Sequence, residues 1–190
     1  PKGTFEGDGN TGDLRFTLLM KAAALCNNAV LERSGISVGG LFRGLAKGRT
    51  APEWSIMGDP TEGALLVMAA KAGFWRERLE QKEPRLAELP FDSDRKRMTV
   101  LHKLPAGNIA AYVKGAPDSI VELCTHTYQA GAAVPLSPGD KRAILAHNEM
   151  MAEGALRVLA FAYRELPENM KEFHEEEVEQ KLVFLGLAGM

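Results

Sequence analysis

Two stretches in the first half of the chain place apolar residues at every third or fourth position, which is the spacing of an amphipathic helix. The first runs from about residue 14 to residue 30 and follows Asp13, a candidate N-cap. The second follows Asp59, has proline at its first helical position and ends at Gly73. Glu62 stands where it would complete a capping box with Asp59. We therefore expect a helix over each stretch.

The spacing of apolar residues changes to every second position from Arg85 onward, which is typical of strands. We expect strands over residues 85–91, 97–104 and 108–114, and the last two should form a hairpin across Pro105-Ala106-Gly107. The other expected elements are a strand over 54–57, helices over 74–82, 117–124 and 138–153, and strands over 155–166 and 181–189. Because helices and consecutive strands alternate irregularly, the pattern predicts an α+β fold, an antiparallel β-sheet flanked by helices.

Three segments lack a clear period. Residues 1–12 are rich in glycine and polar residues and are interpreted as a flexible lead-in, and residues 33–53 as a loop with weak strand character. The letters G-x-G-x-x-G occur at residues 7–12, but a poor strand precedes them and Asp8 would repel a pyrophosphate, so they favour a flexible terminus. The charged residues 172–181 are expected to form the solvated face of a helix.

Composition narrows the class of protein. A chain of 190 residues with 45% hydrophobic and 25% charged residues is ordinary for one globular domain. The net charge of −2 argues against non-specific binding of nucleic acid, which needs a basic excess. Cys26 and Cys124 are too few for a disulfide framework. Because no run of 18 apolar residues occurs, we expect no membrane contact by this chain.

Motifs of metal or covalent catalysis are weak or missing. Asp92 and Asp94 form a D-x-D pair, but Arg95, Lys96 and Arg97 follow at once and would neutralise it, so a turn with solvated carboxylates is expected. The sequence has no phosphate-binding loop of the G-x-x-x-x-G-K-[ST] type and no G-x-S-x-G elbow. We therefore assign no catalytic residue and no metal ligand.

Four segments together carry the residue types that a purine nucleotide needs. Phe91 offers a ring on which a base can stack, which is worth about 1–3 kcal/mol. Glu62 can accept a hydrogen bond from an exocyclic amine. The cations available for phosphate are Lys96, Lys114 and Arg157. Taken singly, such residues are more often core or solvated side chains, and alone they indicate only an α+β domain with a local anion site.

In their order along the chain, the four segments resemble the nucleotide-binding (N) domain of P-type cation-transporting ATPases. GDPTEGALL at residues 58–66 is similar to the family's GD-x-TE-x-AL element, and FDSDRKRM at 91–98 to its F-x-S-x-RK-x-M element. KGAP at 114–117 is its N-domain signature, and LRVLAFAYREL at 156–166 is similar to its LR-x-LA-x-A strand. The resemblance covers residues 13–190 and is closest to the type II branch, in particular to bacterial calcium pumps.

The resemblance implies how the base of ATP or ADP would be held. Phe91 would stack on adenine, and Leu159 would flank the base. Glu62 would contact the adenine edge, with Thr61 beside it.

It also implies contacts to the rest of the nucleotide. Lys96 and Lys114 would line the adenine and ribose side of the pocket, and Arg157 would reach toward the phosphates. Met98 and Gly115 would shape the pocket.

The resemblance further implies what the chain lacks. The family phosphorylates the aspartate of a D-K-T-G-T motif in a separate P domain, and this sequence contains no such motif. The chain should therefore bind ATP without hydrolysing it, with Mg²⁺ bound mainly through the P domain. It should be a monomeric cytoplasmic domain of an integral membrane protein, with the P and actuator domains of the same pump as partners. Residues 1–12 would lie at the hinge, and the last strand would lead back to the P domain.

Alternatives stay open at this point. The pump could transport another cation, such as Na⁺, K⁺ or H⁺, since ion ligands belong to membrane helices. A free-standing nucleotide-dependent enzyme would need its own nucleophile or metal site. A non-catalytic interaction module would bind no nucleotide at all.

Overall fold

The structure is a computed structural model and describes residues 1, 3, 5, 6, 12–33 and 54–190. The helices within these residues are α1 (Leu14–Leu25), α2 (Pro60–Lys71), α3 (Arg76–Lys82), α4 (Pro117–Leu123), α5 (Pro138–Glu153) and α6 (Glu175–Val178). The strands are β1 (Val30–Arg33), β2 (Trp54–Met57), β3 (Arg85–Asp92), β4 (Arg97–Lys103), β5 (Ile109–Gly115), β6 (Cys124–Gln129), β7 (Ala132–Pro135), β8 (Val158–Leu166) and β9 (Leu182–Gly189). In the described parts of the chain, every helix is too short or too polar to span a lipid bilayer.

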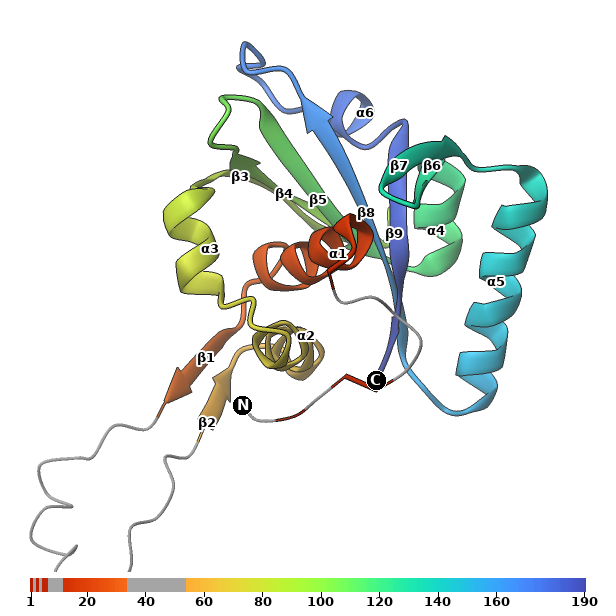
Figure 1. Ribbon diagram of the computed structural model, residues 1–190, viewed down its shortest axis with the longest axis horizontal. Coiled ribbons are helices and arrows are strands. Elements are labelled where there is room, and N and C mark those ends of the chain that lie inside the picture. The colour runs from red at the N-terminus through yellow and green to blue at the C-terminus, as the bar shows by residue number, and fades with distance from the viewer. Residues whose placement is uncertain (2, 4, 7–11, 34–53) are drawn as a thin grey trace, which may run out of the picture.

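A seven-stranded sheet with the order β3-β4-β5-β8-β9-β6-β7 organises the described residues (Figure 1). Its neighbouring strands are antiparallel except β6 and β9, which pair in parallel. A separate antiparallel ribbon of β1 and β2 extends away from this sheet. The predicted α+β fold with a sheet flanked by helices is confirmed, although the parallel pair makes the sheet mixed rather than purely antiparallel.

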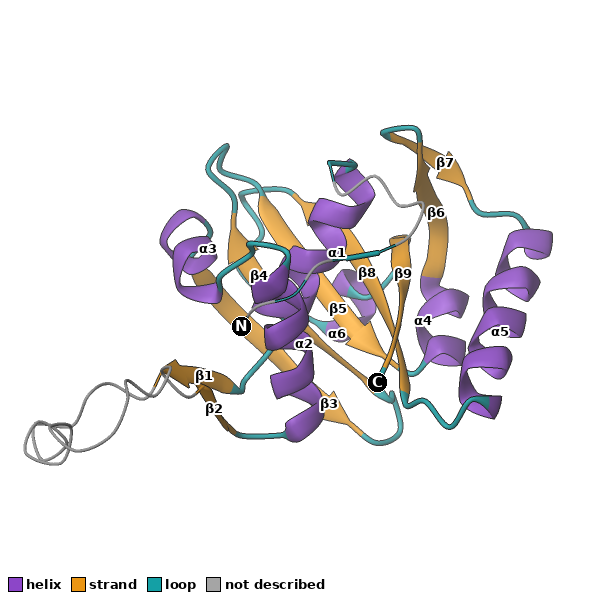
Figure 2. Cartoon of the chain, turned by 60° about the horizontal axis from the view of Figure 1, so that its bottom comes forward, coloured by secondary structure: helices purple, strands orange, loops and turns teal. Residues whose placement is uncertain are grey.

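Strand β5 belongs to the sheet, which is the middle layer between two layers of helices, and each of its residues is buried. Successive side chains of a strand point to opposite faces. Ala110 and Tyr112 accordingly pack in the cluster that contains α1, whereas Val113 packs in the cluster that contains α4. Figure 2 shows helices on both sides of the sheet. A strand covered on both faces is a rigid base for the residues at its end, Lys114 and Gly115.

The first helix is shorter than its apolar spacing predicts. It ends at Leu25 rather than at residue 30. The Asn27 side chain donates to the carbonyl oxygens of Ala23, at 3.1 Å, and of Glu62, at 2.8 Å, and its own oxygen accepts from the amide of Ala29 at 2.9 Å. These bonds give the backbone an alternative to the helical ladder, as asparagine side chains commonly do. The chain therefore leaves the helix and enters β1.

The charged segment at residues 172–181 is not simply the solvated helix face that its composition predicts. Its helix, α6, has only four residues. Val178 and Glu179 are 0% and 3% exposed, so the segment turns inward at its end. The G-x-G-x-x-G letters at residues 7–12 and the expected loop at 33–53 lie almost wholly outside the described residues.

A buried carboxylate joins α1 to the sheet. Glu83 accepts hydrogen bonds from Lys21 Nζ at 2.5 Å and from the Tyr112 hydroxyl at 2.8 Å. The backbone carbonyl of Glu83 lies 2.8 Å from Nδ1 of His102, whose pKa is lowered by burial. Burial, followed by the charge of Glu83, raises the pKa of Tyr112, so this hydroxyl stays a donor. The cluster satisfies its polar atoms internally, which a core position requires.

We predict that Glu83→Ala lowers the free energy of unfolding by about 3 kcal/mol, because Lys21 and Tyr112 lose a shared buried acceptor. Tyr112→Phe removes one of these bonds and keeps the ion pair, so it should cost about 1 kcal/mol. Urea unfolding of the two variants measures the difference. Equal and small losses would contradict a central role for this carboxylate.

Candidate functional site

A cavity of about 620 Å³ opens where the four sequence segments meet. Its walls come from the start of α2, the end of β3 with the turn after it, the connection from β5 to α4, and the start of β8. All nine residues singled out from the sequence line it, namely Thr61, Glu62, Phe91, Lys96, Met98, Lys114, Gly115, Arg157 and Leu159. The structure thus brings together side chains that lie up to 98 residues apart between Thr61 and Leu159.

The N-terminus of α2 forms one wall and is capped as predicted. Oδ1 of Asp59 accepts from the amides of Thr61, at 2.8 Å, and Glu62, at 3.0 Å. These backbone bonds, with the charge of Arg157 as a smaller cause, hold the pKa of Asp59 below its usual range. The predicted capping box is wrong, however, because the Glu62 carboxylate bonds to Lys114 and the amide of Asn28 instead of closing onto Asp59.

An ion pair between Glu62 and Lys114 crosses from α2 to β5. Lys114 Nζ donates to Oε1 of Glu62 at 2.6 Å, and the Lys114 and Glu62 side chains are 7% and 16% exposed. Oε2 of Glu62 accepts from the amide of Asn28 at 3.1 Å. A buried ammonium needs such a partner, because an unpaired charge would lose its hydration without compensation. The pair therefore fixes α2 against the end of β5.

Cys26 lies close to this ion pair. Its Sγ donates to the carbonyl oxygen of Met98 at 3.6 Å, and it is fully buried. Burial raises the pKa of the Cys26 thiol to about 11, while Lys114 and Glu62 act on it with opposite signs. The thiol is therefore neutral at physiological pH and serves as packing rather than as a nucleophile.

Phe91 stands at the end of β3 with 64% of its surface exposed, which is unusual for a phenylalanine. The turn after it is closed by Asp92, whose Oδ1 accepts from the amides of Asp94 and Arg95 at 2.9 Å each. Lys96 then adopts a left-handed backbone conformation with φ of 54°. Its side chain is 58% exposed, with Nζ 3.7 Å from Asp118.

The two arginines beside Lys96 do not pair with the aspartates of the D-x-D pattern. Arg95 and Arg97 both bond to Glu179, at 2.8 and 2.7 Å. The expected turn with solvated carboxylates is confirmed, since Asp92 and Asp94 are exposed. Backbone hydrogen bonds, with the charges of Arg95 and Arg97 as smaller causes, lower the pKa of Asp92. The ion pairs of the two arginines with Glu179 are contacts that the sequence did not indicate. Among the described residues, no group of three histidine, cysteine, aspartate or glutamate side chains is placed to hold a metal ion.

Gly115 allows β4 and the turn to approach β5 closely. It pairs with Arg97 in the ladder, and the amide of Ala116 donates to the carbonyl oxygen of Lys96 at 2.9 Å. A Cβ atom at Gly115 would lie 2.5 Å from that oxygen and 2.6 Å from Cβ of Arg97. Only glycine fits, so the K-G-A-P segment and the turn that carries Lys96 share one narrow contact.

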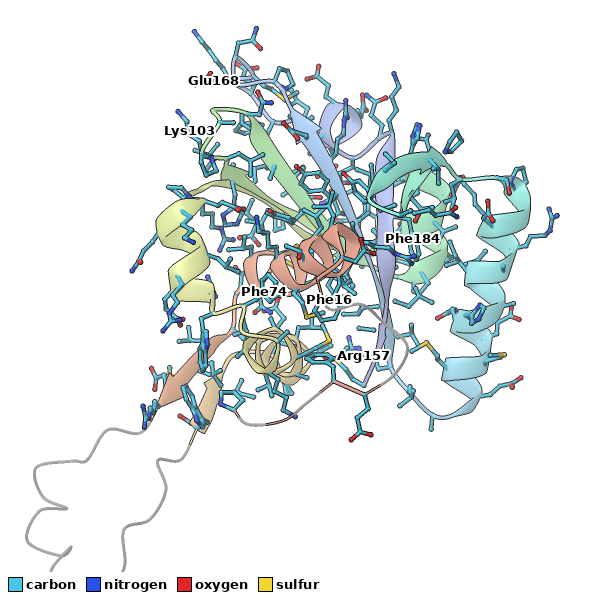
Figure 3. All side chains as sticks on the ribbon, viewed as in Figure 1. Phe16, Phe74, Lys103, Arg157, Glu168 and Phe184 are labelled. Carbon is cyan, nitrogen blue, oxygen red and sulfur yellow. The ribbon has the colours of Figure 1, made fainter. Side chains whose placement is uncertain are left out.

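Arg157 and Leu159 complete the cavity from the start of β8. The backbone of Arg157 exchanges two hydrogen bonds with Met190, at 2.9 and 3.0 Å, while its side chain is exposed. In Figure 3 the Arg157 side chain lies beside α2. Leu159 is half-buried and also contacts the main core.

Chemically, the cavity suits a ligand with a flat apolar part and a negatively charged part. It combines an exposed aromatic ring with three cations and two carboxylates. Its described lining contains no cysteine, histidine or serine that could act as a nucleophile or base. Four further residues that the sequence motifs did not single out also line the cavity, namely Asp59, Ala116, Pro117 and Val158. All four lie within the quoted segments, but Asp59 was assigned only a capping role and the other three none.

We predict that Gly115→Ala lowers the free energy of unfolding by about 1–3 kcal/mol, because the new methyl group meets backbone and Cβ atoms rather than a flexible side-chain end. Gly139→Ala is the matched control, since the nearest atom to its Cβ would be 3.5 Å away. That control should be neutral or slightly stabilising in the first turn of α5. Thermal unfolding compares them, and equal stability of the two variants would contradict the close approach.

Comparison with known proteins agrees with this geometry. The family described as the cytoplasmic domain N of P-type ATPases matches residues 15–190. Calcium-transporting ATPase 1 of Lactococcus lactis is 34% identical over 173 residues, 91% of this chain and 17% of that protein. Cation-transporting ATPase pma1 of Synechocystis is 37% identical over 167 residues, 87% of this chain and 16% of that protein.

A further relative, calcium-transporting ATPase 1 of Bacillus cereus, is 39% identical over 133 residues, which are 70% of this chain and 15% of that protein. The chain thus spans about one sixth of the length of these relatives. The match extends over all four segments that line the cavity. The chain belongs to the P-type cation-transporting ATPases, as their cytoplasmic domain N.

Proposed function

We propose that this chain is the ATP-binding domain of an ion-translocating pump, of the calcium type by the names of two of its relatives. It would hold ATP so that the γ-phosphate can pass to an aspartate in a separate P domain. The observation that carries the proposal is the convergence of nine residues from four segments on one cavity. In the full pump, the P and actuator domains would be its partners, and membrane helices would bind the ion.

The base would occupy the side of the cavity that Phe91 and Leu159 provide. Phe91 is 64% exposed as a residue, so its ring is accessible for stacking. Each oxygen of the Glu62 carboxylate accepts one hydrogen bond from the protein, and each keeps a lone pair for an exocyclic amine. Lys114 would stay paired with Glu62 and present its stem to the adenine and ribose.

The phosphates would meet Arg157, whose side chain is exposed at the cavity, while Lys96 would line the adenine and ribose side. Because no group of three candidate metal ligands lies together in the described residues, we propose that Mg²⁺ is bound mainly through the P domain. Phosphoryl transfer depends on positioning and on charge neutralisation. This chain would supply the positioning of the nucleotide, and the P domain would supply the nucleophile.

The chain alone is proposed to bind ATP as a monomer without hydrolysing it. The phosphorylated D-K-T-G-T motif of the family does not occur in its sequence. A relative named only as cation-transporting leaves the ion open, so a pump for another cation remains the alternative.

Binding of ATP to this chain, followed by NMR or calorimetry, tests the proposal. One stacked ring, a few hydrogen bonds and exposed cations should give a net of about 4–6 kcal/mol, or a dissociation constant between about 1 mM and tens of micromolar. We predict that Phe91→Ala weakens binding by about tenfold or more through loss of the stack, since that loss is worth about 1–3 kcal/mol.

Met150→Ala is the control, because Met150 is 62% exposed on α5 and does not line the cavity. It should leave the affinity unchanged, and the same samples should release no phosphate above a buffer blank. No binding at 10 mM ATP, or reproducible ATP turnover that survives further purification, would contradict the proposal.

Competition among ATP, ADP, AMP and GTP distinguishes the contacts to the base from the contacts to the phosphates. ADP should bind within about tenfold of ATP, with or without Mg²⁺, because one exposed cation adds only about 0–1 kcal/mol. Arg157→Ala should narrow the difference between ATP and AMP, whereas Glu62→Ala should reduce the preference for ATP over GTP. If tripolyphosphate alone displaced ATP efficiently, the cavity would be a phosphate site rather than an adenine pocket.

A further inference from the structure

Glu179 is the most completely enclosed carboxylate near the cavity, although it does not line it. It lies between α6 and β9, and its side chain is 0% exposed. Its oxygens accept four hydrogen bonds, two from Nη1 of Arg95 at 2.8 Å, one from Nε of Arg97 at 2.7 Å and one from the Thr99 hydroxyl at 2.6 Å. One buried carboxylate therefore holds both arginines that flank Lys96.

The two arginines also donate hydrogen bonds to backbone carbonyl groups of the turn that carries Lys96, and so restrain its backbone. Nη2 of Arg95 donates to the carbonyl oxygen of Pro90, the residue before Phe91, at 2.7 Å. Nη1 of Arg97 donates to the carbonyl oxygen of Arg95 and to Oγ of Ser119, both at 3.0 Å. The Ser119 hydroxyl in turn donates to the Arg95 carbonyl at 2.8 Å. Turn, strand end and the first turns of α4 are thus bonded to one another behind the cavity.

This network encloses a strained residue. Lys96 has φ of 54°, a conformation that non-glycine residues keep only where the surrounding structure determines it. Its amide donates to the Asp92 carbonyl at 2.7 Å, and its carbonyl accepts from Ala116 at 2.9 Å. Because its own side chain is exposed toward the cavity and solvent, the side chains that fix its backbone are those on either side of it.

We propose that Glu179 is a positioning residue for the nucleotide pocket, acting through Arg95 and Arg97 on the turn that presents Phe91 and Lys96. The inference rests on the proposed function of the cavity. It also assigns Arg95 and Arg97 to the support of the turn, so that the charge offered to the ligand from this segment comes from Lys96. Buried ion pairs are weak sources of stability but can select one arrangement of the chain, which is the role inferred here.

Four variants test this role. Glu179→Gln keeps the size of the side chain but removes the charge that both arginines need. Ser119→Ala removes the hydroxyl that joins α4 to Arg97 and to the Arg95 carbonyl, without leaving a buried charge unpaired, so it stays informative if Glu179→Gln fails to fold. Glu175→Gln is the first control, because Glu175 also pairs with Arg95, at 3.1 Å, but its side chain is 48% exposed. Tyr112→Phe is the second control, since it destabilises the core away from the cavity.

Two readouts separate positioning from general stability. In the nucleotide-free chain, amide chemical shifts of residues 94–96 and of Ala116 should move in Glu179→Gln and Ser119→Ala and stay in place in both controls. ATP affinity should fall by about tenfold in Glu179→Gln and about threefold in Ser119→Ala, where tenfold corresponds to about 1.4 kcal/mol. Both controls should bind ATP within about twofold of the original chain, a change of about 0.4 kcal/mol.

The outcomes are distinguishable. If the unchanged chain binds no ATP, the proposed function itself is wrong. If it binds ATP and the folded Glu179→Gln and Ser119→Ala variants bind equally well, the positioning role of Glu179 is overturned. The role is also overturned if Tyr112→Phe loses as much affinity as Ser119→Ala at a similar loss of thermal stability.

Discussion

The burial of the Lys114 ammonium is the constraint on which the arrangement of the cavity depends. Strand β5 is covered by helices on both faces and is buried up to its last residues, so the Lys114 side chain is only 7% exposed even though it lines the cavity. An ammonium held there needs a counter-charge, and Glu62 supplies it from the first turn of α2 at 2.6 Å. This requirement explains why Glu62 does not close a capping box, why Asp59 caps the helix alone, and why α2 begins at the cavity rather than elsewhere on the sheet.

The turn that carries Lys96 depends on a second buried carboxylate, Glu179, whose effect on the cavity differs from that of Glu62. Glu62 neutralises one cation that lines the cavity, whereas Glu179 withdraws two cations from it. The sequence R-K-R therefore presents only its middle residue to the cavity, although all three side chains carry the same charge. Lys96 alone of the three has a left-handed backbone, while Arg95 and Arg97 bond to the buried Glu179. Charge counted along a sequence consequently overestimates the charge that this cavity offers an anion.

Elements with a strong local signal could be predicted from the sequence, and contacts made at long range could not. The start of α2 was predictable because Asp59 and the proline after it act within one turn. The end of α1 was not, because Asn27 is held by the carbonyl of Glu62, 35 residues away. Glu179 is preceded by similar glutamates that stay exposed, and only the position of Arg95 and Arg97 in the folded chain distinguishes it. The cavity residues were found through a family resemblance rather than through spacing, since no periodic pattern relates the four segments.

Under the proposed function, the same geometry determines which part of the nucleotide this domain can hold firmly. The rigid groups of the cavity are the Glu62–Lys114 pair and the turn behind Phe91, and both would face the base and ribose. The group proposed for the phosphates, Arg157, is an exposed side chain with many rotamers, which contributes little binding energy. A nucleotide that is bound mainly through its base, with weak contacts to its phosphates, keeps its γ-phosphate accessible to a second protein surface. A tight phosphate cradle within this domain would add no rate to the transfer, because interactions that bind the ground state and the transition state equally well do not lower the barrier.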